Sequence, residues 1–216
     1  MPENIILYDY CRSSAAYRVR IALNLKNFKY QQQSVNLLDS AQTSTLHQQR
    51  NTQKLVPVLC DNDVKISQSM AICEYLDEAY PDSPQLVTGT AVERAKIRSF
   101  SQAIACEIHP LNNLRVLKYL VSEIGATEEQ KLQWYHHWIN STFCALEQQL
   151  SQRSNNSTFC FTDQPGLAEA CLIPQVFNAR RFNIDMHDYP LLMAIDQQCQ
   201  ALPAFAKAHP GNQPDS

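Results

Sequence analysis

Residues 7–25 read LYDYCRSSAAYRVRIALNL, and this stretch decides how the rest of the chain is interpreted. It begins inside an apolar run of strand length, residues 5–8. Further along, Tyr17, Ile21 and Leu25 recur at a spacing of four residues, which places them on one face of a helix. The stretch therefore predicts a strand that passes directly into a helix.

Arg12, Ser13 and Ser14 lie at the predicted junction between this strand and this helix. A helix N-terminus presents free backbone N–H groups and a partial positive charge, so it favours an anion. Two hydroxyls and a guanidinium at such a place could hold and activate a thiolate or a carboxylate. A simpler explanation stays open, because serine is a preferred N-cap residue whether or not a ligand binds.

The composition limits the classes of protein that this chain can belong to. It has 216 residues, of which 44% are hydrophobic, and this predicts one large or two small domains with a packed core. The formal net charge is −3 and no basic run occurs, which argues against nucleic acid as the main partner. No apolar stretch approaches the roughly 20 residues of a membrane helix. The first residues also lack the features of a signal peptide, so we expect a cytoplasmic protein.

Cysteine, histidine and glycine exclude several kinds of chemistry. The eight cysteines include no Cys-x-x-Cys pair, so we expect reduced thiols rather than a zinc site or disulfides. Cys11 lies two residues before Ser13, but a reactive thiolate is usually found at the helix N-terminus itself. His136 and His137 are adjacent and would point to different faces of a helix, so they could not easily bind one metal ion together. The four glycines are far apart, which excludes a Walker loop and a Gly-x-Gly-x-x-Gly fingerprint.

The chain divides into a front that alternates strands and helices and a back that is helical. In residues 1–84, the order strand-helix-strand-helix-hairpin-helix is that of a thioredoxin-like α/β domain. The elements after the first helix are a strand at 29–35, a weak helix at 40–49, a hairpin at 56–66 and a helix that opens at 67–69. Residues 85–90 follow two prolines and end near a glycine, and we interpret them as a linker. Residues 91–216 are expected to form an all-α domain.

Several local signals organise the predicted helical domain. Pro110 is expected to kink or break the first helix. Thr127 and Gln130 form a capping box that opens a long helix. Residues 167–176 are apolar nearly all round, which indicates a central buried helix. The expected buried faces of the first and the long helix are Ile97, Phe100, Ile104 and Ile108, and Trp134, Trp138, Leu146 and Leu150.

The sequence resembles the zeta class of glutathione transferases, the class that includes the maleylacetoacetate isomerases, almost from end to end. The segments that carry the resemblance are Arg12-Ser13-Ser14 with 17–23, then 35–38, 56–59, 68–72, 109–114, 174–182 and 209–215. The double serine and the Asn-Ala-x-Arg-Phe segment are the most specific of these. The resemblance implies a glutathione transferase fold, glutathione as cofactor and a homodimer.

The resemblance also implies a glutathione site. Ser13, beside Ser14, would donate a hydrogen bond to the glutathione sulfur and favour the thiolate. Val56, before a cis-proline, would pair its backbone with the cysteinyl part. Gln68 and Ser69 would hold the γ-glutamyl carboxylate. Further contacts implied by the class are Gln42 from the front domain and His109, Asn113 and Arg115 from the helical domain. Each of these residues also has an ordinary explanation, such as capping or a solvated charge.

The implied reaction is the cis–trans isomerisation of maleylacetoacetate to fumarylacetoacetate in tyrosine and phenylalanine breakdown. This small-molecule substrate is a dicarboxylate, and Arg12 and Arg181 are the candidate cations because a guanidinium forms a rigid fork. Alternatives are a maleylpyruvate isomerase, a transferase that acts on halo-acids, and a non-catalytic protein that kept the fold. A scaffold would not need thiol-activating groups such as Ser13.

The sequence departs from the zeta-class pattern at two places. Ala15 stands where a cysteine commonly follows the serine pair, so any contribution of that thiol is missing. The usual Ser/Thr-x-x-Asp capping box of the buried helix reads Gly166-Leu167-Ala168-Glu169. Glycine can still occupy the N-cap and Glu169 can still reach back to it.

Overall fold

The computed structural model describes residues 2, 4–153 and 156–216, and the chain forms two compact units. One unit comprises Met1–Thr88 together with Gln200–Ser216, and the other comprises Gly89–Cys199. The boundary near residue 88 lies within the predicted linker. The predicted helical domain, 91–216, differs from the second unit at its end, because residues 200–216 belong to the first unit.

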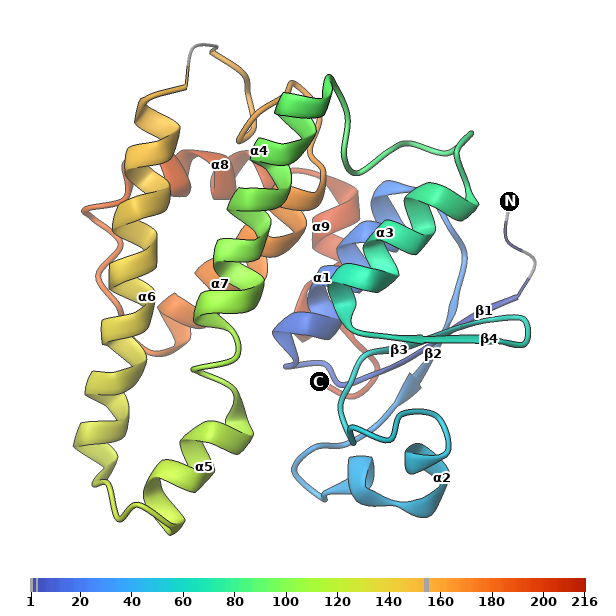
Figure 1. Ribbon diagram of the computed structural model, residues 1–216, viewed down its shortest axis with the longest axis vertical. Helices are drawn as coiled ribbons and strands as arrows, with labels where there is room; N and C mark the ends of the chain where they lie inside the picture. Colours follow the sequence, from blue (N-terminus) through green and yellow to red (C-terminus); the bar gives the residue numbers. More distant parts are fainter. Residues whose placement is uncertain (1, 3, 154–155) are drawn as a thin grey trace. The chain divides into compact units, whose positions relative to one another are not determined.

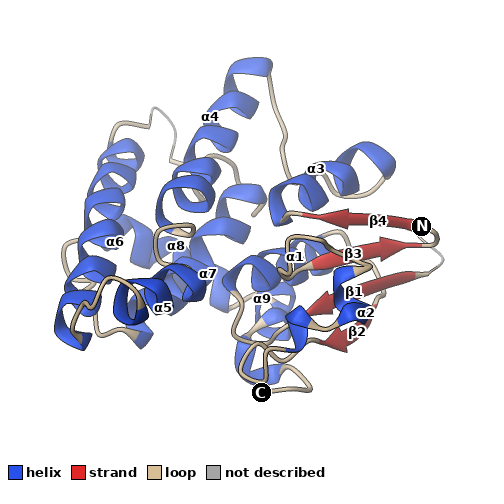
Figure 2. Cartoon of the chain, turned by 60° about the horizontal axis from the view of Figure 1, so that its bottom comes forward, coloured by secondary structure: helices blue, strands red, loops and turns tan. Residues whose placement is uncertain are grey.

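The first unit is built on a four-stranded mixed sheet, shown in red in Figure 2. Its strands are β1 (Ile5–Asp9), β2 (Gln31–Ser34), β3 (Val58–Asp61) and β4 (Val64–Ser67). The order is β2-β1-β3-β4, with β1 parallel to β2 and the other pairs antiparallel. This is the sheet of a thioredoxin-like domain, and the parallel pair β1 and β2 is connected through a helix, as parallel strands require.

Helices α1 and α3 of the first unit pack against one face of this sheet. The helical segments of this unit are α1 (Ser14–Leu25), η1 (Ala41–Thr43), α2 (Thr45–Gln48), α3 (Ser69–Ala79), α9 (Pro203–Ala208) and η3 (Pro210–Asn212). Leu7 and Leu59 from the sheet, Val19 from α1 and Ile72 from α3 belong to one core cluster. The predicted weak helix at 40–49 is instead two short helical segments, η1 and α2.

The segment after Gln200 returns to α1, and Figure 1 shows α9 in red beside α1 in blue. Asn24 Nδ2 donates to the carbonyl of Ala204 at 2.9 Å, and Arg20 Nε donates to the carbonyl of Ala208 at 3.0 Å. Phe205 is fully buried. The segment belongs to the first unit because it supplies both apolar area and hydrogen-bond acceptors to α1. No local sequence pattern predicts a contact between residues so far apart in the chain.

The second unit is helical. Its elements are α4 (Ala91–Gln102), a π-helical segment η2 (Ala103–Ile108), α5 (Leu114–Ser122), α6 (Glu128–Ser151), α7 (Leu167–Arg181) and α8 (Pro190–Gln200). Within α4 and η2 the predicted stripe is confirmed, since all four of its residues are buried. The capping box of Thr127 and Gln130 is also confirmed at the start of α6.

Two other expectations for the helical unit have mixed outcomes. The helix ends near Pro110 as predicted, but its winding already widens at η2, where the His109 N–H donates to the Ile104 carbonyl at 3.0 Å. The predicted buried face of α6 is wrong at Trp134 and Trp138, which are only half-buried. The residues of α6 that are buried are Tyr135, Ile139, Phe143, Leu146 and Leu150.

Helix α7 is the buried helix of the second unit, as predicted, because every residue from 167 to 176 is buried. Gly166 is its N-cap residue, and the Gly166 N–H donates to Glu169 Oε2 at 2.7 Å. The other carboxylate oxygen, Oε1, accepts the Cys160 N–H at 2.8 Å. Glu169 therefore reaches back to the N-cap although the N-cap residue has no side chain.

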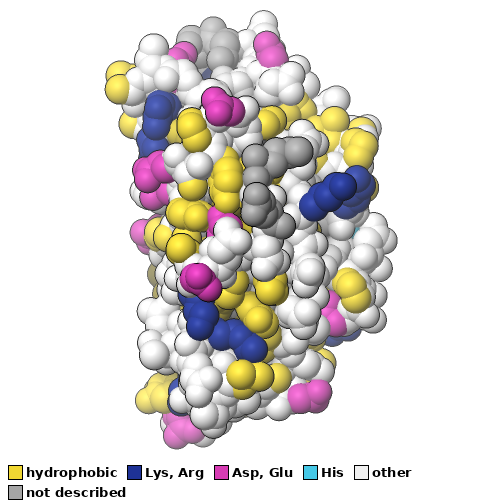
Figure 3. Space-filling model, turned by 90° about the vertical axis from the view of Figure 1, so that its right-hand side faces the viewer, with side chains coloured by type: hydrophobic (Ala, Val, Ile, Leu, Met, Phe, Trp, Pro, Cys, Tyr) yellow, Lys and Arg dark blue, Asp and Glu magenta, His cyan; other side chains and the backbone are white. Residues whose placement is uncertain are grey.

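Charges of both signs are scattered among apolar and uncharged atoms on the face drawn in Figure 3. This distribution agrees with the small formal net charge of −3. Among the described residues, no helix is both long enough and apolar enough to cross a membrane.

Candidate functional site

Ser13 is the N-cap of α1, and its side-chain oxygen accepts the N–H of Ala16 at 3.2 Å. Its own N–H donates to the carbonyl of Tyr10 at 2.9 Å, which closes the turn between β1 and α1. A hydroxyl has one proton to donate and two lone pairs, so a capping serine can still donate outward. Capping and hydrogen bonding to a ligand are therefore compatible for Ser13. Ser14 is the first residue of α1 and half-buried, whereas Arg12 is exposed.

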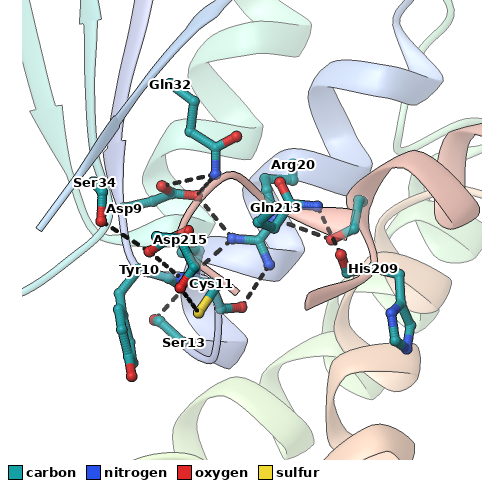
Figure 4. A network of polar contacts seen from close by, with 12 residues as sticks. Asp9, Tyr10, Cys11, Ser13, Arg20, Gln32, Ser34, His209, Gln213 and Asp215 are labelled. Carbon is teal, nitrogen blue, oxygen red and sulfur yellow. Dashed lines mark hydrogen bonds and ion pairs between the residues drawn. The ribbon is translucent and has the colours of Figure 1, made fainter. Parts of the chain in front are cut away.

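The turn that carries Ser13 is held by a buried arginine, as Figure 4 shows. Arg20 donates to Asp9 Oδ2 at 2.7 Å and to the carbonyl of Cys11 at 2.9 Å. Gln32 from β2 donates to both oxygens of Asp9 at 3.0 Å. Asp9 and Arg20 have no exposed side-chain surface. The end of β1 and the start of the turn are thus fixed by a buried network of charged hydrogen bonds.

Asp215 holds the same turn from the other side (Figure 4). Its Oδ2 accepts the Cys11 N–H at 3.0 Å and the Ser34 hydroxyl at 2.8 Å. Cys11 Sγ donates to the carbonyl of Asp215 at 3.2 Å, and Cys11 is only 2% exposed. Burial, followed by the Asp215 charge, raises the pKa of the Cys11 thiol. These features oppose a nucleophilic role for Cys11.

A second helix N-terminus in the first unit carries two more of the predicted site residues. Gln68 is the N-cap of α3, with a positive φ of 71°, and its exposed side chain donates to Gln53 Oε1 at 2.7 Å. Ser69 is the first residue of α3 and is 6% exposed. Its hydroxyl oxygen accepts Arg18 Nη1 at 2.5 Å. Since Arg18 is in α1, that helix connects the Ser13 corner to the Ser69 corner.

Val56 precedes Pro57 through a cis peptide bond, as the resemblance implied. The loop that leads to it is held at the carbonyl of Leu55, which contacts His47 Nε2 and Asn51 Nδ2, both at 3.0 Å. These two contacts fix the backbone immediately before Val56.

Gln42 lies in η1 and is half-buried. Its Oε1 is buried and, within the described part of the chain, has no hydrogen-bond partner. A buried amide oxygen without a partner is costly, so Gln42 is a candidate to gain a donor from a ligand.

Three candidates lie at the start of α5 in the second unit. His109 follows η2 and is half-buried. Asn113 is the N-cap of α5, and its Oδ1 accepts the Arg115 N–H at 3.1 Å. Arg115 is exposed. The capping explanation for Asn113 therefore holds, and its ligand role stays a prediction.

Arg181 is the last residue of α7, where it is exposed and lies 4.9 Å from the centre of the Phe182 ring. One turn of α6 contacts both the residue after Arg181 and the segment 109–115. Trp134 Nε1 donates to the Leu111 carbonyl at 3.0 Å, and His136 Nε2 contacts the Phe182 carbonyl at 2.8 Å.

Sequence reasoning missed Arg18, Arg20 and Asp215 as residues that organise the site. The available signal was that both arginines occur in a helix whose other residues are mostly apolar. Residues 15–23 of α1 are all buried, so neither arginine is on a solvent face.

The structure contains no sign of metal or disulfide chemistry in the residues that it describes. No group of three or more His, Cys, Asp or Glu side chains there could hold a metal ion. All eight cysteines are free, and six of them are buried.

Comparison with known proteins agrees with this fold. Residues 3–78 match the family described as the glutathione S-transferase N-terminal domain. A probable maleylacetoacetate isomerase of Vibrio cholerae is 45% identical, with 99% of each chain covered. A bacterial zeta-class glutathione S-transferase described as a maleyl pyruvate isomerase has a TM-score of 0.95 at 40% identity, covering 98% of this chain and 99% of that one.

One further solved structure carries ligands. It is a maleylacetoacetate isomerase of Methylobacterium extorquens AM1 with bound malonate and glutathione. It has a TM-score of 0.92 at 34% identity and covers 98% of this chain and 99% of that one.

A thioredoxin-like unit with a serine at its first helix N-terminus, followed by a helical unit, defines the class: the chain belongs to the glutathione transferase family. Within that family it is a member of the zeta class, together with the maleylacetoacetate and maleylpyruvate isomerases.

Proposed function

We propose that this protein is a glutathione-dependent isomerase that converts maleylacetoacetate to fumarylacetoacetate. The observation that carries the proposal is the position of Ser13 at the N-terminus of α1, with its oxygen occupied as a cap and its proton able to donate. The relatives named maleylacetoacetate isomerase support the choice of substrate.

The residues of the first unit fit glutathione. Ser13 can donate to the sulfur, while the helix N-terminus at Ser69 favours the γ-glutamyl carboxylate. Val56 lies two residues before the start of β3 at Val58, so its backbone is outside the strand and can pair with the cysteinyl part. Gln42 offers to an N–H of the tripeptide a buried oxygen that has no hydrogen-bond partner among the described residues. We assign further glutathione contacts to Gln68, His109, Asn113 and Arg115.

When bound, glutathione supplies a thiolate that adds reversibly to the activated double bond, which can then rotate as a single bond. The residues of the chain must favour the thiolate and stabilise the negative charge that develops on the substrate. Ser13, with Ser14 beside it, serves the first purpose together with the positive end of α1. Arg12 and Arg181 serve the second and hold the two substrate carboxylates, because a guanidinium binds a carboxylate with two parallel hydrogen bonds.

We further propose that the protein acts in the cytoplasm as a homodimer, within tyrosine and phenylalanine breakdown. These statements rest on zeta-class membership. Sedimentation of the purified protein tests the dimer directly.

The central experiment measures isomerisation of maleylacetoacetate with and without glutathione. Turnover should require glutathione and should fall about a hundredfold in Ser13→Ala, the size typical of losing one donor to a developing charge. Arg181→Ala should raise KM for the dicarboxylate. Lys65→Gln removes an exposed positive charge on β4 and is the control. If neither Ser13→Ala nor Arg181→Ala lowers activity, the site assignment is wrong even though the family is right.

Maleylpyruvate is the second candidate substrate, favoured by the similarity to a maleyl pyruvate isomerase with a TM-score of 0.95. The ratio of kcat/KM values for maleylacetoacetate and maleylpyruvate decides between them. A protein that binds glutathione but isomerises neither would instead be assayed for conjugation to halo-acids, and a protein that does not bind glutathione would be a scaffold.

A further inference from the structure

Arg18 is a buried cation with few partners. Its side chain lies in α1 and the residue is 2% exposed. Nη1 donates to the hydroxyl of Ser69 at 2.5 Å, whereas Nε is buried without a hydrogen-bond partner in the described part of the chain. No acidic residue among those described forms an ion pair with it.

The other buried cations of the first unit are paired. Arg20 contacts Asp9 at 2.7 Å, and Lys26 contacts Asp77 at 2.8 Å. An arginine stays protonated inside a protein, and a buried charge without a counterion is costly. The cost at Arg18 is therefore not offset by the described residues of the chain itself.

The contact with Ser69 indicates where the missing negative charge binds. Ser69 opens α3, an 11-residue helix whose N-terminus favours an anion. Its oxygen accepts from Arg18, and a hydroxyl that accepts in this way keeps its own proton for another partner. Arg18, Ser69 and the helix dipole thus all favour a negative charge at one place.

We infer that Arg18 is a positioning residue whose counterion is the γ-glutamyl carboxylate of bound glutathione, reached through the Ser69 hydroxyl. This inference rests on the proposed function. It assigns to α1 a second task, five residues beyond Ser13: the helix that presents the sulfur donor also supplies the buried charge for the opposite end of the tripeptide.

The test compares two ligands by calorimetry. One is reduced glutathione, and the other is γ-aminobutyryl-cysteinyl-glycine, which lacks only the γ-glutamyl α-carboxylate. Arg18→Met should weaken glutathione binding about tenfold, the effect of losing one hydrogen bond in a charged network. It should change the affinity for the analogue less than about twofold, because the analogue has no charge to lose. Arg18→Lys, which keeps the charge, should restore part of the difference.

Two further measurements separate this role from a purely structural one. Adding Arg18→Met to Ser69→Ala should cost little more than Ser69→Ala alone, since residues that act through one contact are not additive. The unfolding midpoint of ligand-free Arg18→Met should not fall, because replacing an uncompensated buried charge by an apolar side chain is often neutral or stabilising.

Equal weakening of both ligands, no weakening of either, or a large fall in the ligand-free midpoint would overturn the inference. In any of these cases wild-type isomerisation with glutathione would leave the proposed function standing. A wild-type protein that does not bind glutathione would overturn both.

Discussion

Arg20 and Asp9 form an ion pair of 2.7 Å in which neither side chain is exposed to solvent. Arg20 also donates to the carbonyls of Cys11 and Ala208, so one guanidinium joins the end of β1, the turn before α1 and the end of α9. Removing one partner from such a pair leaves the other charge buried and uncompensated.

The first prediction concerns this pair. Arg20→Met should lower the free energy of unfolding by about 3–5 kcal/mol, the cost of breaking a buried pair by removing one partner. The double variant Asp9→Asn/Arg20→Met should lose less than the sum of its single variants, because it leaves no unpaired charge. Urea denaturation measures both. Strict additivity would show that the two side chains do not act as a pair.

The second prediction concerns Asp215, whose Oδ2 accepts from Cys11 and Ser34. Asp215→Ala frees the backbone of the turn that carries Ser13, and a displacement of about 1 Å can cost about a hundredfold in rate. We expect kcat for isomerisation to fall at least tenfold. Ser34→Ala removes only the hydroxyl contact and is the matched control; an equal loss in that variant would exclude a specific role for the turn.

The third prediction concerns thiol reactivity and its dependence on pH. Burial, followed by the Asp215 charge, raises the pKa of the Cys11 thiol, so little thiolate exists at pH 8. Iodoacetamide should therefore modify the exposed Cys106 and Cys144 first, with Cys11 reacting faster as the pH rises. In Asp215→Ala one cause of the raised pKa is gone, so Cys11 should react faster at the same pH. Mass spectrometry of the folded protein checks each site, and rapid labelling of wild-type Cys11 would contradict this account.

The fourth prediction concerns the N-cap of α7. Glu169 is 2% exposed and accepts backbone N–H groups from Gly166 and Cys160. Glu169→Ala leaves both donors buried without a partner, which should lower the free energy of unfolding by about 3 kcal/mol. Glu169→Gln keeps one acceptor oxygen and should lose less. Thermal unfolding of both variants is the measurement, and equal losses would indicate a packing effect instead.

Local signals in the sequence predicted the parts of the fold that depend on local chemistry. Ser13 at its helix N-terminus, the capping box of Thr127 and Gln130, and the apolar run at 167–176 each lie within one or two helical turns. Their physics is contained in a few residues, so a pattern is sufficient. The thioredoxin-like order of elements along the chain could be predicted for the same reason. The strand order in the sheet, β2-β1-β3-β4, could not be predicted from these local patterns.

The parts that could not be predicted depend on residues far apart in the chain. Asp215 and Cys11 are separated by 204 positions, and Arg18 and Ser69 by 51. Nothing near Arg18 or Arg20 in the sequence identifies the partner of its side chain. A charged residue in a helix is usually assigned to a solvent-facing position. The error at Trp134 has a related cause, because the ring remains at the edge of the core with its N–H donating to the Leu111 carbonyl.

The return of residues 200–216 to the first unit has a consequence for dissecting the protein. A fragment cut after Thr88 would lose the Ala208 carbonyl that accepts from Arg20, the apolar cover of Phe205 and the carboxylate that braces the Cys11 turn. A fragment that keeps the first unit whole would need 200–216 fused back onto 1–88 through a short artificial connector. Exchanging 89–199 for the helical segment of another transferase would leave all residues of the first unit in place, so chimeras of altered substrate choice are best joined at these two positions.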